Sequence, residues 1–269
     1  MRRLMLKQLT IDFKGLNYRS AICSILYLAL GTRGDIIFII NKLAKACVDP
    51  GRTDYDALLW LLGYLRAEPA WGSKYYSNTS ESPVQSILTE LNIPASEIIV
   101  FTDASWQDCP DTGRSTSGFF IFYRGGVLEA NSGLSIPVAM SSCEAEVMSA
   151  ASGCMAAAHL HMLLYDIKYL GTKSYNDTQL ALPNPPTVLL VDNQAACKMS
   201  INDKLTRHTR HISRRFHFVR EGQKLKLHNI TWCPSDNMLA DITTKTQAAT
   251  KINPHRDRAY FRLPKHMEK

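Results

Sequence analysis

Apolar runs and helix-forming stretches alternate along residues 97–245, and this alternation most limits the folds open to the chain. Three strand-like runs come first, one in EIIVFTDA and two in GFFIFYRGGVLEANSG, which turns at its RGG sequence. A long helical stretch then begins at Ser141 or Ser142. The strand-like runs TVLLVDN and LKLHNITWCP follow, together with the helical stretches QAACKMSI, HTRHISRRFHFVREGQ and SDNMLADITTK. This order predicts an α/β fold with a mixed sheet and helices on its faces.

Four carboxylates stand at the ends or beginnings of these elements. Asp103 and Asp192 end strand-like runs, Glu146 lies near the start of the long helix, and Asp241 lies in the last helical stretch. Acids gathered at the ends of buried elements are costly unless a positive charge accompanies them. Mg²⁺ is a hard ion that prefers carboxylate oxygen. The pattern therefore points to metal-dependent phosphodiester chemistry.

Each of these acids also has a simpler interpretation when it is taken alone. Asp103 and Asp192 are of a residue type that often begins loops, so both could be ordinary turn residues. Asp241 could be a surface acid near a helix N-terminus, which is common. The metal interpretation gains its weight from the set of four acids, because one three-layer domain can bring all of them together.

Glu144 competes with Glu146 for the position that faces the sheet. Residues two apart on a helix point to different faces, so only one of the two is expected there. Ala150 and Gly153 share the side of Glu146 and would let the helix approach the strands closely. We therefore expect Glu146 to face the sheet and Glu144 to lie in solvent near the positive end of the helix dipole.

Composition and the pattern of predicted elements divide the chain into four parts. Residues 1–77 are read as a helical region that breaks at PG and at PAWG. Residues 78–96, rich in Ser, Thr, Asn and Pro, are read as a linker with about one helical turn. Residues 97–245 form the predicted α/β domain, and residues 246–269 a basic tail.

The net charge of +7 is concentrated in the stretch that starts at Lys204, KLTRHTRHISRRFHFVREGQKLK. Such a basic surface suits a phosphate backbone, although a solvated helix face would have the same composition. The seven cysteines are scattered without a C-x-x-C pair, which argues against a disulfide scaffold or a zinc ribbon and favours a reducing compartment.

The sequence contains no apolar run of the ~20 residues that a membrane span needs. The N-terminal MRRLMLKQLTIDF has basic residues but no long apolar stretch or clear cleavage site, so we expect no secretory signal. The expected location is cytoplasmic or nuclear, and an organelle-import role for this segment stays open.

Five motifs occur in one order along the predicted domain: FTDASWQDCPDTGRSTSGFFIF, SSCEAEVMSAA, VDNQAACKM, TRHISRRFHFVRE and PSDNMLADITTK. Together they resemble the ribonuclease H domain of copia-type LTR retrotransposon polyproteins. Upstream, YRSAICSILYLALGTRGDIIFIINKLAKACVDP and LLWLLGYLRAEPAWGSKYY resemble the C-terminal end of the reverse transcriptase of the same elements. The resemblance implies a ribonuclease H-like three-layer fold with a mixed five-stranded sheet. It makes residues 1–77 a helical remnant of the reverse transcriptase.

The resemblance also implies a chemistry. The family's metal-binding acids fall on Asp103, Glu146, Asp192 and Asp241. The implied reaction is hydrolysis of the RNA strand of an RNA–DNA hybrid with two Mg²⁺ ions, or Mn²⁺ in their place. Asp103 would bridge both ions, Glu146 and Asp192 would complete one site, and Asp192 or Asp241 the other. The polymerase palm, with its paired aspartates after an aromatic residue, does not occur in the sequence, so DNA synthesis is not expected.

Candidate nucleic-acid contacts lie beside the third acid and on the basic helix. Asn193 and Gln194 are polar candidates for reading 2′-hydroxyls across a wide minor groove, although Asn193 could instead cap the following helix. Arg210, Arg214 and His217 share one face of the basic helix and could contact phosphates.

The positions of three tryptophans in the sequence predict where their side chains lie. Trp106 follows the first acid by three residues, so we expect it beside the site. Trp60 and Trp232 lie in apolar runs and are predicted to be core residues.

The chain departs from the family pattern in several places. Gly34 stands where Pro is usual, Trp is usual near Ala130, and NSGLS lacks the usual basic pair. The missing palm, the altered stretch 129–135 and the basic tail favour an alternative, a domesticated non-catalytic fragment that serves as a structural or nucleic-acid-binding subunit. A transposase or integrase is disfavoured, because the order of acids in those enzymes ends in a Glu on a helix, whereas Glu146 is the second acid here.

The expected partners are an RNA–DNA hybrid and the rest of a Pol polyprotein or a host assembly, without a membrane.

Overall fold

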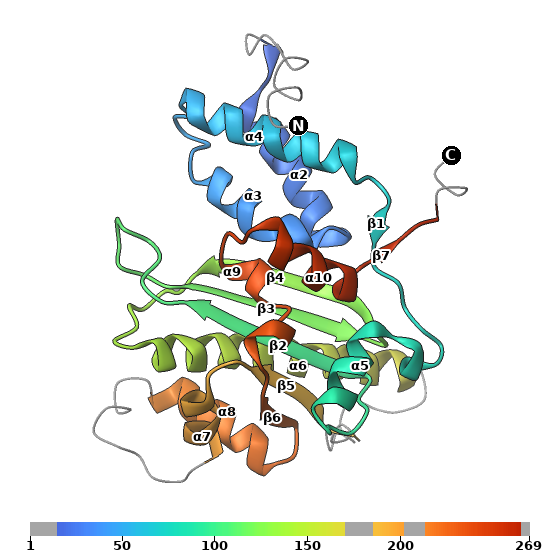
Figure 1. Ribbon diagram of the computed structural model, residues 1–269. Helices are drawn as coiled ribbons and strands as arrows, with labels where there is room; N and C mark the ends of the chain where they lie inside the picture. The colour runs from blue at the N-terminus through green and yellow to red at the C-terminus, as the bar shows by residue number, and fades with distance from the viewer. Residues whose placement is uncertain (1–14, 170–184, 202–212, 265–269) are drawn as a thin grey trace.

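A five-stranded mixed sheet forms the centre of the computed structural model, which describes residues 15–169, 185–201 and 213–264 (Figure 1). The strand order is β4-β3-β2-β5-β6. β2 pairs antiparallel with β3 and parallel with β5, β3 pairs antiparallel with β4, and β5 pairs parallel with β6. The strands are β2 (Ile98–Ser105), β3 (Thr116–Tyr123), β4 (Gly126–Leu134), β5 (Thr187–Val191) and β6 (His228–Trp232).

The hairpin between β3 and β4 turns at Arg124 and Gly125, as the sequence predicted. Both residues have positive φ angles, 47° and 79°, and this backbone matches the right-handed twist of two paired strands. The predicted α/β fold with a mixed five-stranded sheet is confirmed, and the five predicted strands of residues 97–245 all form.

One face of the sheet is covered by α6 (Ser142–Tyr169), α7 (Gln194–Ile201) and α8 (Ser213–Lys224) (Figure 1). Gly153 allows α6 to approach the sheet, because a Cβ atom there would lie 2.7 Å from Thr102 Cγ2. The small residue that was expected to permit this approach therefore does so. The shared core contains Val100, Ile121, Val147, Ala151, Leu189, Phe216 and Val219.

Elements from both ends of the chain cover the opposite face (Figure 1). They are α2 (Tyr18–Gly31), η2 (Gly34–Ile36), α3 (Ile37–Ala44), α4 (Arg52–Ala67), α5 (Pro83–Glu90), α9 (Asp241–Thr244) and α10 (Ala249–Ala259). Their side chains and those of the sheet form one core, which includes Ile22, Ile37, Ile40, Leu58, Ile99, Phe101, Phe120 and Phe122. The helical region predicted before the α/β domain is thus a layer of the same structure.

The segments that were read as a linker and a basic tail are folded where the structure describes them. Residues 78–96 contain η3 (Thr79–Glu81) and α5, whose Val84, Ile87 and Leu88 are fully buried in the core. Residues 246–264 contain α10 and β7 (Phe261–Arg262), which pairs antiparallel with β1 (Trp71–Gly72). Both segments are mainly polar or basic, so their composition did not indicate that a few apolar residues pack them against the core. The functional boundaries between the four parts stay a prediction.

A buried polar network joins the first helices to the C-terminal helix. Arg33 forms two hydrogen bonds of 2.9 Å with the carboxylate of Asp35, a bidentate geometry that is strong for this pair. Tyr64 donates to Asp35 Oδ2 over 2.7 Å, and Arg256 Nη1 donates to Tyr64 Oη over 3.2 Å. Because Arg33 and Asp35 are both buried, their mutual pairing satisfies charges that would otherwise be costly inside the protein.

The end of the predicted domain differs from the single capped helix that SDNMLADITTK suggested. It consists of the short η6 (Ser235–Asn237) followed by the four-residue α9, which begins at Asp241.

Among the described residues, one stretch, Ser142–Ile167 of α6, has the length and hydropathy of a membrane span. Half of it is buried against the rest of the protein, as in the core helix of an α/β domain.

Candidate metal centre

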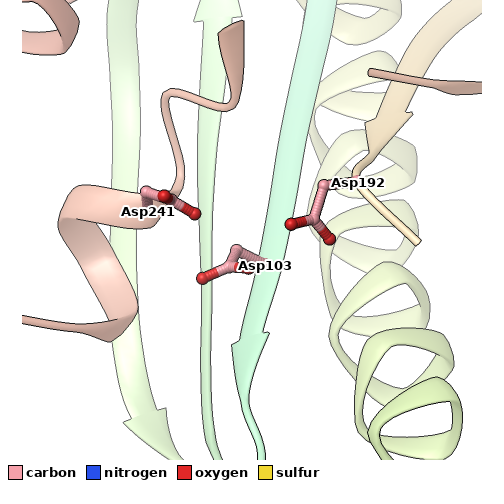
Figure 2. A group of neighbouring side chains, drawn as sticks. All are labelled: Asp103, Asp192 and Asp241. Atoms are coloured by element: carbon pink, nitrogen blue, oxygen red, sulfur yellow. The ribbon is translucent and has the colours of Figure 1, made fainter. Parts of the chain in front are cut away.

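Three of the four predicted acids meet near the C-terminal ends of the neighbouring strands β2 and β5 (Figure 2). Asp103 lies on β2, Asp192 directly follows β5, and Asp241 is the first residue of α9. Their side chains point toward a common space, and one carboxylate oxygen from each lies within 4.8 Å of the others. Asp103 and Asp241 are buried and Asp192 is half-buried.

Strand pairing places Asp103 beside Asp192. β2 and β5 are parallel neighbours, and Thr102 pairs with Val191 in their register. The next residues along the chain, Asp103 and Asp192, therefore lie side by side near the C-terminal ends of two strands that are ~5 Å apart. This is the arrangement that two apolar runs ending in Asp predicted.

Gly118 brings the third acid to the other two. It is the β3 partner of Asp103, and a Cβ atom at Gly118 would overlap the side chain of Thr243 in α9. The absence of a side chain thus lets α9 lie against the sheet. Asp241, at the start of α9, consequently reaches Asp103.

Glu146 lies next to this triad but is directed differently. Its Oε1 atom accepts a hydrogen bond of 3.2 Å from the Ala104 backbone N–H, and its buried Oε2 atom finds no hydrogen-bond donor among the described residues. Burial raises the pKa of Glu146 well above its ordinary value, and the charges of Asp103 and Asp192 raise it further. The structure therefore groups three acids tightly and places the fourth at their side.

The prediction for Glu144 was wrong in its exposure. Glu144 is only 4% exposed, and its Oε2 atom accepts a hydrogen bond of 2.7 Å from the Met140 backbone N–H. The carboxylate folds back over the N-terminus of α6, where unpaired N–H groups attract an acid. It therefore packs beside the helix start instead of extending into water, while Ser141 Oγ accepts the N–H of Glu144 over 3.2 Å.

The electrostatics of the triad favour a bound cation. Burial raises the pKa of Asp103 to about 6, although the charge of Lys245 opposes the rise. Burial also raises the pKa of Asp192, against the same lysine. Carboxyl groups removed from water hold their negative charge only at a cost, and a divalent cation between them would offset that cost.

Lys245 is a residue of this site that the sequence analysis missed. Its Nζ atom lies 2.8 Å from Asp241 Oδ1 and 3.5 Å from Asp103 Oδ2. The neighbouring Thr244 donates its hydroxyl to Asp103 Oδ2, and Gln247 Nε2 donates to Asp241 Oδ2 over 2.8 Å. The spacing of four residues between Asp241 and Lys245 on a helix was the available signal.

The residues present fit a hard divalent ion. The donor set is made of carboxylate oxygens, which Mg²⁺ and Mn²⁺ prefer. Glu146 Oε2 adds a buried oxygen that has no donor among the described residues. The free cysteines nearest in sequence to these acids, Cys143 and Cys197, are absent from the triad.

The predicted nucleic-acid contacts have different fates. Asn193 Oδ1 accepts the backbone N–H groups of Ala195 and Ala196 over 2.9 and 3.1 Å, so its side chain caps α7, the alternative left open for it. Gln194 is exposed at the start of α7, and Arg214 is exposed on α8.

Of the other two predicted contacts, the structure describes only His217. His217 is half-buried and contacts Arg220, with 2.7 Å between its Nδ1 atom and Arg220 Nη2. Arg210 lies outside the described residues. Among the residues that the structure describes, Gln194, Arg214 and His217 form no hydrogen bond or ion pair with the acid triad.

Two of the three tryptophan predictions were wrong. Trp60 and Trp232 are exposed by 47% and 40% instead of lying in the core. Trp60 faces outward from α4, and Trp232 ends β6, where its indole N–H reaches the backbone of Asp192. Trp106, exposed by 44%, lies beyond the end of β2 that carries Asp103 and donates to the Ala139 carbonyl over 3.0 Å.

Comparison with known proteins relates the chain to retrotransposon polyproteins. It is 26% identical over 250 residues to the retrovirus-related Pol polyprotein from transposon TNT 1-94 of Nicotiana tabacum, covering 90% of this chain and 16% of that protein. It is 25% identical over 228 residues to the Pol polyprotein from transposon RE2 of Arabidopsis thaliana, covering 85% of this chain and 14% of that protein. The predicted resemblance to a Pol polyprotein is thereby confirmed, and the chain spans only a small part of either relative.

Two further likenesses were found. The chain is 28% identical over 136 residues to secreted RxLR effector protein 161 of Plasmopara viticola, covering 51% of this chain and 85% of that protein. Among solved structures, the N-terminal RNase H domain of a Mycobacterium tuberculosis protein aligns with 61% of this chain and 98% of its own, at 13% identity and a TM-score of 0.39. No family model matches the chain.

Proposed function

We propose that this chain, a homologue of retrotransposon Pol polyproteins with a ribonuclease H-like domain, hydrolyses the RNA strand of RNA–DNA hybrids with divalent metal ions. The convergence of Asp103, Asp192 and Asp241 within 4.8 Å carries the proposal. These acids come from three elements far apart in the sequence, and their burial would be costly without a cation. The similarity of the chain to retrovirus-related Pol polyproteins from transposons also supports it.

In this proposal the carboxylates hold and orient the metal. Asp103, Asp192 and Asp241 would hold the ions through their carboxylate oxygens. Glu146, whose Oε2 is buried without a hydrogen-bond donor among the described residues, would supply a further carboxylate oxygen. The bound ions would activate a water molecule and stabilise the leaving 3′-oxygen. The Ala104 backbone N–H and the Thr244 hydroxyl fix the orientation of Glu146 and Asp103.

Substrate contacts remain proposals that rest on exposure and charge. Gln194 lies two residues after Asp192 and is exposed at the start of α7, so it could contact a 2′-hydroxyl. Arg214 and His217 on α8 would contact phosphates at a greater distance from the cleavage point. Asn193 is a weaker candidate, because its side-chain oxygen is already occupied by the α7 cap.

A second candidate function is supported by Lys245. Its ammonium group already supplies a positive charge to Asp241 and Asp103, so the acids are partly neutralised without a metal. A non-catalytic protein that binds nucleic acid or has a structural role in an assembly would need only this neutralisation of its buried acids and no metal ion. The two candidates differ in whether a hybrid is cleaved.

The decisive experiment is cleavage of an RNA–DNA hybrid whose RNA strand is labelled. The wild-type protein is expected to cut the RNA with Mg²⁺ or Mn²⁺ and to be inactive with chelator. Asp192→Asn should lower the rate by at least about 100-fold, beyond the 10–100-fold typical of residues that only support a metal ligand. Asp236→Asn, an exposed acid of η6, is the matched control and should retain activity. Hybrid binding without metal-dependent cleavage would support the non-catalytic alternative.

A further inference from the structure

Lys245 reaches the acid triad from the end of α9. Its backbone N–H donates to the Asp241 carbonyl over 3.2 Å, which fixes the start of the side chain one turn beyond that acid. The side chain then extends to the carboxylates, and its Nζ atom lies 2.8 Å from Asp241 Oδ1 and 3.5 Å from Asp103 Oδ2. Two of the three acids therefore share one ammonium group.

No other described cation takes part in this cluster. Among the described residues, the other groups that donate a hydrogen bond to the carboxylates of Asp103 and Asp241 are the hydroxyl of Thr244 and the amide of Gln247, and both are neutral. Among the described residues, the positive charge within contact distance of the Asp103 and Asp241 carboxylates thus comes from Lys245. Removing its charge would change the electrostatics of the site without removing a carboxylate.

A metal ion and this ammonium cannot both occupy the cluster at low cost. A divalent ion bound to Asp241 Oδ1 would lie ~2.1 Å from that oxygen. Because Nζ is 2.8 Å from the same oxygen, the two positive centres would be no more than about 5 Å apart. Like charges at that separation in a buried site repel strongly. The ammonium, on a long flexible side chain that is 40% exposed, can withdraw into solvent.

We propose that Lys245 is an internal counter-cation of the acid site, which a divalent metal ion must displace in order to bind. The inference rests on the proposed function, because it takes the triad to be a metal site. Lys245 stabilises the metal-free protein by pairing with Asp241 and Asp103, and by the same pairing it lowers the affinity for metal. The lysine therefore sets the metal concentration at which the site fills.

Metal titration by calorimetry tests the competition directly. Mn²⁺ is titrated into wild type, Lys245→Met and Lys245→Arg, without nucleic acid. Lys245→Met should bind Mn²⁺ at least about tenfold more tightly than wild type, whereas Lys245→Arg, which keeps the charge, should remain near wild type. Equal or weaker binding by Lys245→Met would overturn the inference.

Lys42→Met is the matched control for removal of a charge. Lys42 forms one ion pair of 3.0 Å with Asp108, and its side chain is 36% exposed, close to the 40% of Lys245. The substitution changes the net charge by the same amount away from the triad. Its Mn²⁺ affinity should equal that of wild type, and a tightening like that of Lys245→Met would show a general charge effect and overturn the inference.

Amine reactivity gives a second readout that needs no substitution. Wild-type protein is acetylated with and without saturating Mn²⁺, and the rate at each lysine is followed by mass spectrometry. Displacement predicts that Mn²⁺ raises the acetylation rate of Lys245 several-fold and leaves that of Lys42 unchanged. An unchanged or lower rate at Lys245 would contradict displacement.

The outcomes separate this inference from the proposed function. If wild type and Lys245→Met bind Mn²⁺ equally while hybrid cleavage is lost in Asp192→Asn, the inference fails and the nuclease function stands. If Lys245→Met binds more tightly but no protein cleaves the hybrid, the inference stands and the nuclease function fails. If neither protein binds Mn²⁺, both fail.

Discussion

Trp232 donates its indole N–H to the backbone carbonyl of Asp192 over 3.0 Å. The two residues lie at the ends of adjacent parallel strands, since Val191 pairs with Trp232 in the register of β5 and β6. The backbone N–H of Cys233 adds a hydrogen bond of 2.9 Å to the Val191 carbonyl. The chain that leaves β5 is thus held against β6 at the point where Asp192 enters the acid triad.

Replacing Trp232 by Phe should loosen this attachment. The variant keeps an aromatic ring but loses one hydrogen bond, which contributes about 1 kcal/mol to stability. Asp192 would then be less well oriented, so we expect Mn²⁺ affinity to fall several-fold in calorimetric titration. Trp60→Phe, another exposed tryptophan on α4, is the control and should bind as wild type does. A Trp232→Phe protein of unchanged Mn²⁺ affinity would contradict the positioning role.

Gly118→Ala tests the contact that delivers Asp241. A Cβ atom at this position would lie 2.7 Å from Thr243 Cβ and 2.8 Å from Thr244 Cγ2. Because α9 must then move away from β3, unfolding free energy measured with urea should fall by about 1–3 kcal/mol, as in other overpacked cores. Mn²⁺ binding should weaken as well. Gly133→Ala on β4, where a Cβ atom meets nothing within 4 Å, should change neither quantity appreciably.

Local patterns were sufficient to predict the sheet and two of its acids. The apolar runs before Asp103 and Asp192 correctly indicated neighbouring strands, because buried parallel strands read as continuous apolar segments. The preference for Glu146 over Glu144 as the acid nearer the site was supported by small residues at helical spacing, and Gly153 does pack against Thr102. Each of these inferences depended on a few adjacent residues.

The features that were missed depend on contacts between distant parts of the chain. Lys245 meets Asp103 only because α9 packs against β3, and no local pattern encodes that packing. Residues 78–96 and 246–264 have polar compositions, yet α5 buries three apolar side chains and α10 contributes Ala259 to the core. Trp232 lies in an apolar run but ends an edge strand, where one side remains open.

The predicted domain, residues 97–245, should not fold stably by itself. Its sheet residues Ile99, Phe101, Phe120 and Phe122 are buried against helices from outside that range. Exposing side chains of this size costs about 1.5–3 kcal/mol each, which is comparable in total with the ~5–15 kcal/mol stability of a whole domain. We expect aggregation or a poorly dispersed NMR spectrum from this fragment. The full chain should give a dispersed spectrum, and a dispersed, monomeric fragment would refute the prediction.

The buried His228 should make stability depend on pH. Burial lowers the pKa of His228 below its ordinary value of 6.5, and its Nε2 atom lies 2.8 Å from the Val219 carbonyl. The unfolded chain therefore binds a proton near pH 6.5 that the folded protein refuses until a lower pH. The contribution of His228 is fully present above pH 6.5 and is lost as the pH falls below it.

Urea unfolding at pH 7.5 and pH 5.5 measures this contribution. His228→Gln keeps an N–H donor for Val219 but does not titrate, so its unfolding free energy should fall less between the two pH values than that of wild type. His159→Gln removes an exposed histidine of the same protein and should retain the wild-type pH dependence. Only proteins that keep His228 can take up this extra proton on unfolding. An identical pH dependence for His228→Gln and wild type would therefore show that His228 is protonated equally in the folded and unfolded states.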